Sequence, residues 1–413
     1  MKKVLPVIGL WALVAAAQAA PAPDPASAVV VHYADLAWAI YGDSASAARN
    51  LQTAVDAFLT HPNAQSLSEA RAAWKMARVP YLQSEGFRFA NGVVDGWEPK
   101  VNAWPLDEGL IDYVAPSYGA QSDQNPLYTL NVIANTRLRV GARIVDATII
   151  DAALLRQLQQ AEGVQTNVST GFHAIEFLLW GQNLDGANGG AGVRAASDYD
   201  PAACTHGNCA RRAAYLKAAS DLLVADLTEM ADGWRPGGSA RAELLAKGRD
   251  GGLAEILTGL GSLTFGEMAG ERMKLGLMLH DPEEQQDCFS NNTHNSHYYD
   301  EIGIGEIWRG RYVRGDGTVL EGPSLRDYAA SVDAKAAQRL DDRLADASVR
   351  IGQIKTAADG GKMAYSQMIA AGNAQGNKMI QDAMDALVAQ TRAIEGVAAA
   401  LHLQVASNKS DHH

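Results

Sequence analysis

The chain has few cysteines, few aromatic residues and a shortage of positive charge. Of 413 residues, 3 are Cys and 7% are aromatic, and 35 Lys and Arg face 47 Asp and Glu, giving a net charge of −12. No basic stripe interleaved with aromatic residues is present, so we expect no nucleic-acid partner. Beyond the N-terminal region no stretch has 18 uninterrupted apolar residues, which predicts no transmembrane segment after it.

The first 19 residues have the features of a secretory signal peptide. Lys2 and Lys3 precede an apolar run at 4–17, and the small-x-small sequence "AQA" ends at Ala19. A membrane anchor is the alternative, but Pro and Gly interrupt the run and leave it too short to span a bilayer. The sequence therefore predicts a periplasmic protein, cleaved near Ala19, with the "PAPDP" segment at 21–25 as an extended leader.

Two of the three cysteines lie close together in a glycine-containing loop. In the segment "CTHGNC", Cys204 and Cys209 flank His206, and export to an oxidising compartment favours a disulfide between them. The alternative is a thiolate metal site that includes His206, which would need further ligands from elsewhere in the chain. Cys288 is left over, and we expect it to be a buried free thiol.

Helical periodicity dominates the chain, and no segment shows convincing strand alternation. One of the helical segments starts with Ser66 followed three residues later by Glu69, the pattern of a capping box. The sequence thus predicts an all-α fold. The segments with apolar residues at helical spacing are 30–59, 66–83, 211–230, 252–279, 325–355 and 363–403.

Long irregular loops separate these helices, at 91–124, 181–207 and 280–323. The second loop is rich in glycine and is the best candidate for a domain boundary. We therefore expect an N-terminal half at 28–200 and a C-terminal half at 208–405. The sequences "SEGFR" and "AGERM" each place a Glu and an Arg late in the second helix of a half, which indicates an internal duplication.

One polar stripe interrupts an otherwise apolar segment, "STGFHAIEFLLWG". His173 and Glu176 lie three residues apart, which puts them on the same side of a helix, about 60° apart. An ionised carboxylate buried there is costly unless it is paired, protonated or bound to a cation. Three interpretations satisfy this constraint: a structural hydrogen-bonded pair, two ligands of an iron or zinc ion, or a general base at Glu176.

The sequence around this pair resembles that of the imelysin family. The resemblance rests on "GFHAIEFLLWG", which contains Gly-x-His-x-x-Glu, and on "AWKMARVPYLQSEGFRF", "WPLDEGLIDY", "YLKAASDLLVADL", "ERMKLGLML" and "CFSNNTHNSHYYD". It is closest to the iron-regulated protein A branch. It implies an exported protein of two four-helix-bundle-like halves with a cleft between them, a link to iron uptake, and His173 and Glu176 as the signature pair. The family takes its name from an insulin-cleaving peptidase.

The sequence ranks metal binding above peptide cleavage. No His-Glu-x-x-His occurs, and if Glu176 is a ligand then a hydrolytic site lacks its base. Further ligands must come from the irregular loops or from the other half. The candidates are Glu85, Asp107, Glu271 and His294, with Glu108, Asp287 and His297 as additional acids and imidazoles in the same regions.

Large aromatic and basic residues are candidates for the walls of the cleft. The tryptophans are equally explained as core, and the arginines as partners that neutralise Glu85 and Glu271. A metal ion or small ligand, and partners for iron uptake in the envelope, are the expected binding partners. A third hypothesis is a non-catalytic module that binds a surface protein, haem or polysaccharide. The candidate cleft residues are Trp74, Arg78, Arg88, Trp104, Trp180 and Arg272.

Overall fold

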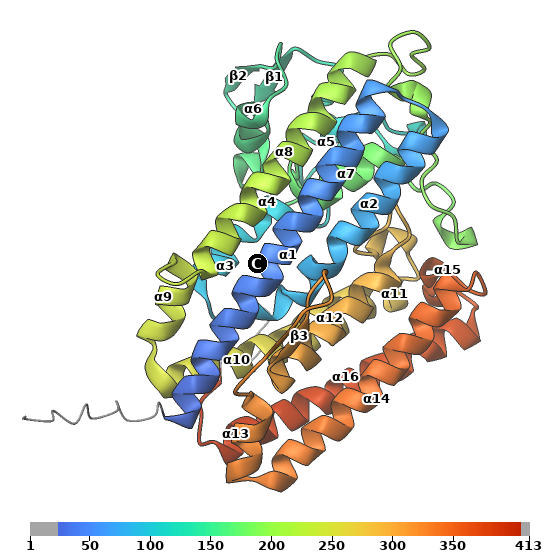
Figure 1. Ribbon diagram of the computed structural model, residues 1–413. Coiled ribbons are helices and arrows are strands. Elements are labelled where there is room, and N and C mark those ends of the chain that lie inside the picture. The colour runs from blue at the N-terminus through green and yellow to red at the C-terminus, as the bar shows by residue number, and fades with distance from the viewer. Residues whose placement is uncertain (1–23, 406–413) are drawn as a thin grey trace, which may run out of the picture.

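The computed structural model describes residues 24–405, and most of them are helical (Figure 1). The predicted all-α class is confirmed as a mostly α-helical fold. In this part of the chain no helix combines the length and the apolarity needed to cross a bilayer. The predicted signal peptide, residues 1–19, lies outside the described residues.

Three long helices form what we call the first helical group: α1 (Pro25–Thr60), α2 (Ala64–Gln83) and α8 (Cys209–Trp234). In Figure 1, α1 lies lengthwise between the other two. Tyr33 and Ile40, two helical turns apart on α1, are both buried, as the apolar spacing predicts. The group supplies the two walls against which the short helix α7 packs.

The start of α2 is set by a side-chain cap. Asn63 accepts hydrogen bonds from the backbone N–H groups of Gln65 and Ser66, and Ser66 Oγ accepts one from the Asn63 N–H at 3.2 Å. The predicted capping box of Ser66 and Glu69 is therefore wrong, because the helix begins three residues earlier. Asn caps a helix as well as Ser does, so Asn63 takes the cap position and Ser66 becomes the third residue of the helix.

The second helical group consists of α12 (Thr293–Arg309), α14 (Ala334–Asp359) and α16 (Ala374–Ala400). α14 packs along α16, and α12 contacts both α14 and α2, so it joins the two groups (Figure 1). The predicted irregular loop at 280–323 is therefore wrong over α12. The residues of this helix that made the segment look like a loop, His294, His297 and Asp300, are buried, and each has a partner in another element.

Shorter elements connect the groups. The predicted helix at 252–279 is continuous but has a π-helical centre, η6, between α10 and α11. The connecting helices are α3 (Gly92–Trp97), α4 (Pro99–Asn102), α5 (Glu108–Ile111), α6 (Ala152–Leu158), α7 (Gly171–Trp180), α9 (Ser239–Ala246), α10 (Gly248–Gly261), η6 (Ser262–Met273), α11 (Lys274–Leu279), α13 (Leu325–Val332) and α15 (Tyr365–Ile369). The 3₁₀ turns are η1 (Glu85–Phe87), η2 (Pro116–Tyr118), η3 (Ala161–Gly163), η4 (Gly186–Asn188), η5 (Ala196–Asp198) and η7 (Pro282–Glu284).

Two small antiparallel hairpins correct the expectation of no strands. β1 (Arg137–Val140) pairs with β2 (Arg143–Asp146), and β3 (Arg311–Val313) pairs with β4 (Val319–Glu321). β1 alternates between exposed and buried side chains, which is the strand signal. Strands of three or four residues are too short for that alternation to stand out in a helical chain.

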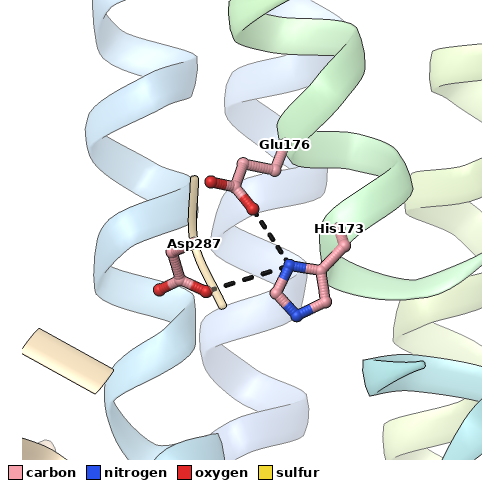
Figure 2. A group of neighbouring side chains, drawn as sticks. All are labelled: His173, Glu176 and Asp287. Carbon is pink, nitrogen blue, oxygen red and sulfur yellow. Dashed lines mark hydrogen bonds and ion pairs between the residues drawn. The ribbon is translucent and has the colours of Figure 1, made fainter. Parts of the chain in front are cut away.

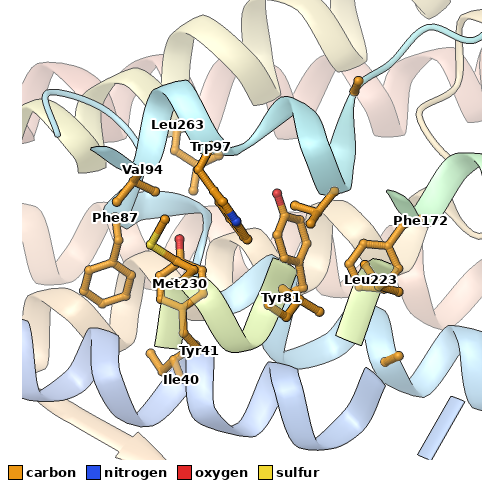
Figure 3. Close-up of a cluster of buried hydrophobic side chains, with 14 of the residues drawn as sticks. Ile40, Tyr41, Tyr81, Phe87, Val94, Trp97, Phe172, Leu223, Met230 and Leu263 are labelled. Carbon is orange, nitrogen blue, oxygen red and sulfur yellow. The ribbon is translucent and has the colours of Figure 1, made fainter. Parts of the chain in front are cut away.

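Buried apolar side chains from both groups form a continuous core. Figure 3 shows the part of it where the first helical group meets α3, α7 and η6. Its aromatic residues meet edge to face, as between Tyr41 and Trp97, whose ring centroids are 5.8 Å apart. The Trp97 indole N–H donates to the carbonyl of Asp226 on α8 at 3.1 Å. The core therefore fixes the loop at 91–124 to the first helical group, while the division into halves at 28–200 and 208–405 stays a prediction.

A buried glutamate in the second group makes stability depend on pH. Glu301 on α12 accepts hydrogen bonds from Ser348 on α14 and Gln390 on α16, and burial raises its pKa to about 8. The folded state therefore holds this proton more tightly than the unfolded chain, where the pKa of Glu is about 4.3. The neutral carboxyl group therefore stabilises the folded state fully below the pKa of the unfolded chain, and this contribution is lost as the pH rises toward 8.

We predict that Glu301→Gln removes this loss. Urea denaturation measures the free energy of unfolding of the variant and of wild type at each pH. The difference, variant minus wild type, should increase by up to about 1.4 kcal/mol per pH unit between pH 5 and 8. Glu395→Gln, at an exposed glutamate on α16, is the control and should track wild type. A difference between Glu301→Gln and wild type that does not change with pH would contradict the prediction.

Candidate metal centre

The helix that carries the signature pair is entirely buried. Every residue of α7 lies in the interior, and the helix packs against α2, α4 and α8. Its first residue, Gly171, has φ +83°, and a Cβ there would lie 2.4 Å from the carbonyl oxygen of Val101. Only glycine fits this position, which explains the Gly in the Gly-x-His-x-x-Glu sequence.

His173 and Glu176 face each other and are joined by a third residue, Asp287 (Figure 2). His173 Nδ1 lies 3.0 Å from Glu176 Oε2 and 3.8 Å from Asp287 Oδ1. One ligand atom from each residue lies within 4.8 Å of the other two, and this is the one such group of three or more found among residues 24–405. Asp287 comes from the segment that leads into α12, so the second helical group completes the site.

Both carboxyl groups are held by hydrogen-bond donors, and Asp287 Oδ1 faces both Arg78 and His173. Glu176 Oε1 accepts hydrogen bonds from the backbone N–H and the hydroxyl of Ser290, at 2.8 and 2.7 Å. Asp287 Oδ1 accepts one from Arg78 at 2.9 Å, and its Oδ2 accepts others from Asn292 and Ser296. These contacts fix the two carboxyl groups with one oxygen of each turned toward His173.

Burial and nearby charge set the protonation of the three groups. Burial, with the neighbouring Asp287, raises the pKa of Glu176 well above its usual value. Burial and the Arg78 guanidinium lower the pKa of His173 to about 3, so its ring is neutral near pH 7. Burial also opposes the charge on Asp287, but Arg78, together with the hydrogen bonds from Ser296 and Asn292, lowers the pKa of that carboxyl. A neutral imidazole beside two carboxyl groups is the chemistry of a metal-ligand set.

The ring of His173 has one nitrogen engaged and one without a partner. Nδ1 faces the two carboxyl groups, whereas the buried Nε2 has no hydrogen-bond partner within the described structure. Arg78 compensates Asp287, but no Lys or Arg nitrogen among residues 24–405 lies within ion-pair distance of Glu176. The guanidinium therefore does not neutralise the whole group.

Glu85, a ligand candidate, and Arg272, a candidate for the cleft wall, belong to an adjoining buried network of hydrogen bonds. Glu85 accepts hydrogen bonds from Arg272 at 2.6 Å and from Asn102 at 3.0 Å. Asn102 in turn accepts one from Arg78 at 2.6 Å, and Arg272 also pairs with Asp300 at 2.9 Å. Glu85 is thus the partner of an arginine, which was the alternative interpretation of Arg272.

The remaining ligand candidates lie outside the group of three. Asp107 accepts a hydrogen bond from Thr166 at 2.6 Å, and His294 pairs with Asp359 at 2.9 Å. Glu271 lies within η6. His294 and its neighbour His297 are on α12 and not in a loop, which corrects the expectation for the "THNSH" segment.

The candidate cleft residues pack against the site or beside it. Trp74 is fully buried, donates its indole N–H to the Phe172 carbonyl at 2.9 Å, and meets Trp180 with ring centroids 5.4 Å apart. Trp104 is half-buried, and Arg88 pairs with Asp95 at 2.9 Å. Trp74 on α2 and Trp180 on α7 therefore pack the two helices together in the core.

Ser290 and Arg78 have roles that the sequence did not assign. Ser290 lies in the quoted segment "CFSNNTHNSHYYD", but nothing in its spacing relates it to Glu176. Arg78 was placed in a cleft wall, and its contact with Asp287 depends on how α2 packs against the start of α12. Only the tertiary structure brings these residues together.

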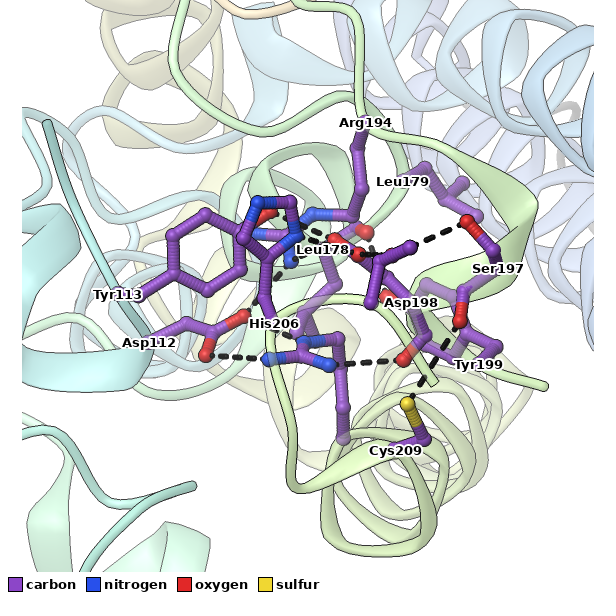
Figure 4. A network of polar contacts seen from close by, with 12 residues as sticks. Asp112, Tyr113, Leu178, Leu179, Arg194, Ser197, Asp198, Tyr199, His206 and Cys209 are labelled. Atoms are coloured by element: carbon purple, nitrogen blue, oxygen red, sulfur yellow. Dashed lines mark hydrogen bonds and ion pairs between the residues drawn. The ribbon is translucent and has the colours of Figure 1, made fainter. Parts of the chain in front are cut away.

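The cysteine pair near α8 forms a disulfide, with Cys204 and Cys209 sulfur atoms 1.99 Å apart. Between them, His206 Nδ1 lies 2.7 Å from Asp198 Oδ1, and its ring stacks on Tyr113 (Figure 4). The alternative of a thiolate metal site is therefore wrong, because bonded sulfur atoms offer no thiolates. Cys288 is the free cysteine of the described chain, as expected, but it is half-buried and not fully buried.

The sequence model of the imelysin family, described as Imelysin, matches residues 37–394. The chain belongs to the imelysin family. One relative is "Iron-regulated protein A" of Synechococcus elongatus, which is 34% identical to this chain over 71 residues. That alignment covers 17% of this chain and 20% of the relative, so the chain spans only a fifth of that protein's length in the match.

Two solved structures share the imelysin-family fold. A putative iron-regulated protein A precursor from Parabacteroides distasonis superimposes with a TM-score of 0.62 at 18% identity. An imelysin-like protein from Psychrobacter arcticum gives a TM-score of 0.61 at 15% identity. In both comparisons 93% of this chain and 97% of the other are covered, which establishes the fold over nearly the whole length.

The position of Gly171 generates a stability prediction for this imelysin-family protein. Gly171→Ala should lower the free energy of unfolding by about 2 to 5 kcal/mol, because it combines a left-handed backbone with a clash against Val101. Gly163→Ala is the matched control, since Gly163 also has a positive φ of +75° but would place its Cβ in open space. The control should lose about 1 to 2 kcal/mol by urea denaturation. Equal losses would show that the backbone contact is unimportant.

Proposed function

We propose that this imelysin-family protein binds a divalent metal ion, iron or zinc, through His173, Glu176 and Asp287. The observation that supports the proposal most directly is the convergence of one imidazole nitrogen and two carboxylate oxygens in a fully buried place. Imidazole and carboxylate together suit Fe²⁺ and Zn²⁺. A bound cation would replace the proton that keeps Glu176 neutral.

The surroundings fit such an ion in charge and in rigidity. Two carboxylates carry a charge of −2 and Arg78 carries +1, so the protein groups around the ion would have a net charge of −1. Ser290 orients Glu176 through Oε1, away from His173, and Asn292 and Ser296 orient Asp287 through Oδ2, as residues behind metal ligands commonly do. The side chains of all three residues are fully buried, which excludes water and strengthens the interaction between the ion and its ligands.

Metal binding accounts for the geometry better than peptide hydrolysis does. A zinc peptidase needs three protein ligands, an open position and a separate base. If Glu176 acts as the base, only His173 and Asp287 remain as ligands in this group. If all three residues bind the ion, no carboxylate in the group is left to activate water.

The proposal places the protein in the periplasm, with a role in iron handling. Two observations support it: the signal-peptide features of residues 1–19, and the names of the relatives, which describe iron-regulated proteins. Partners for iron uptake in the envelope are part of the same proposal. The metal itself is the point that experiment addresses first.

We predict that wild-type protein binds close to one Fe²⁺ or Zn²⁺ per chain, and that Glu176→Gln and His173→Ala/Glu176→Ala do not. Bound metal is measured by elemental analysis after anaerobic loading and gel filtration. Glu301→Gln removes a different buried carboxyl and should keep full occupancy, which controls for a general effect of changing the interior. Equal, negligible occupancy in wild type and variants would contradict the proposal.

The peptidase alternative makes an opposite prediction. A metallopeptidase would cleave insulin B chain, lose activity with a chelator, and regain it with Zn²⁺ in wild type but not in Glu176→Gln. We expect no cleavage above that of Glu176→Gln. Chelator-sensitive cleavage that only the variant lacks would favour hydrolysis over binding.

A further inference from the structure

Asp287 turns a single oxygen toward the metal centre, and an arginine already holds that oxygen. Asp287 Oδ1 lies 3.8 Å from His173 Nδ1 (Figure 2) and accepts a hydrogen bond from Arg78 at 2.9 Å. The other oxygen, Oδ2, accepts hydrogen bonds from Asn292 and Ser296. An ion bound between His173 and Asp287 would therefore share Oδ1 with the guanidinium of Arg78.

The guanidinium of Arg78 is fixed in this position. Its side chain is 1% exposed, and Nη1 donates a hydrogen bond to Asn102 at 2.6 Å. Three aromatic rings surround the guanidinium carbon, with centroids 5.2 to 5.7 Å away, in the range of cation–π contacts. These rings belong to Trp74, Tyr81 and Phe172. An arginine enclosed in this way stays beside Asp287 and keeps its positive charge there.

The charge of Arg78 has opposite effects on the metal-free and the metal-bound protein. Without an ion, Arg78 compensates Asp287, and loss of one partner of such a buried pair is strongly destabilising. With an ion, the same charge repels the cation at short range, where burial of the ligands excludes water. The arginine therefore stabilises the protein in the absence of metal and lowers the affinity for the ion.

We propose that Arg78 makes metal binding at this centre reversible, by compensating Asp287 when no ion is bound and by repelling an ion that is bound. This inference rests on the metal-binding function proposed above. It assigns the centre to an ion that is taken up and released rather than to a structural ion. A structural ion supplies the charge on which folding depends, whereas this fold has a cation of its own at Asp287.

The Zn²⁺ affinity of variants at position 78 tests this role. Arg78→Gln and Arg78→Met remove the charge, while Asn292 and Ser296 still orient Asp287 through Oδ2. Both variants should bind Zn²⁺ at least about tenfold more tightly than wild type, because charges a few ångströms apart in a protein interact by more than the free energy of a tenfold change. Competition with a chelating dye measures the affinity. Release of Zn²⁺ into excess chelator should slow by a similar factor.

Two control variants separate the effect of charge from a general loosening of the interior. Arg78→Lys retains the charge and should keep an affinity close to that of wild type. Arg212→Gln breaks another fully buried pair, that of Arg212 with Asp112 at 2.6 Å, and should lose stability without gaining affinity.

Thermal unfolding provides a second measurement on the same proteins. Without metal, Arg78→Gln should unfold at a lower temperature than wild type, because Asp287 has lost its partner. Added Zn²⁺ should raise the unfolding temperature of the variant by more than it raises that of wild type, because the ion binds the folded variant more tightly. The uncharged variants are therefore prepared with Zn²⁺ present.

The outcomes separate this role from the function on which it depends. If wild type binds no Zn²⁺ that Glu176→Gln loses, the metal-binding function fails and the role of Arg78 fails with it. If wild type binds Zn²⁺ at Glu176 but neither uncharged variant binds it more tightly, only the role of Arg78 is overturned. An equal gain in Arg78→Lys or Arg212→Gln would overturn it too, because charge at Asp287 would then not be the cause. Failure of both uncharged variants to fold with Zn²⁺ present would also overturn it, because the ion would then not take the place of the arginine.

Discussion

The free-energy cost of burying an ionisable group determines which residues surround Glu176 at the centre of this protein. Glu176 is fully buried on a helix whose other residues, His173 apart, are nearly all apolar. Such a carboxyl must be paired, protonated or bound to a cation. The structure meets the requirement with two donors from Ser290 and a neutral imidazole at 3.0 Å, and it adds Asp287 where a third ligand would stand.

The same need to pair buried charges links the two helical groups. Arg78 on α2 holds Asp287 in the segment that leads into α12, and Arg272 in η6 holds both Glu85 in η1 and Asp300 on α12. Removing one partner of such a buried pair leaves an uncompensated charge, so these arginines fix the relative position of the groups. The geometry of the metal centre therefore depends on contacts that lie outside it.

Local features were predictable from the sequence and remote ones were not. The spacing of His173 and Glu176, the disulfide of Cys204 and Cys209, and the long helices each depend on a few neighbouring residues. Asp287 was one of several acids in the loops, and only packing selects it. α12 was missed because its polar residues resemble those of a solvated loop, although His294 pairs with Asp359 and His297 with Tyr365 across the fold.

The central claim is that His173, Glu176 and Asp287 together bind one metal ion. The most direct test is a crystal structure of the protein loaded anaerobically with Fe²⁺, with anomalous scattering recorded at the iron edge. The account predicts a single strong peak within bonding distance of His173 Nδ1 and of one oxygen from each carboxylate. A structure without a peak there, with Glu176 still bound only by Ser290 and His173, would show that the pair is structural.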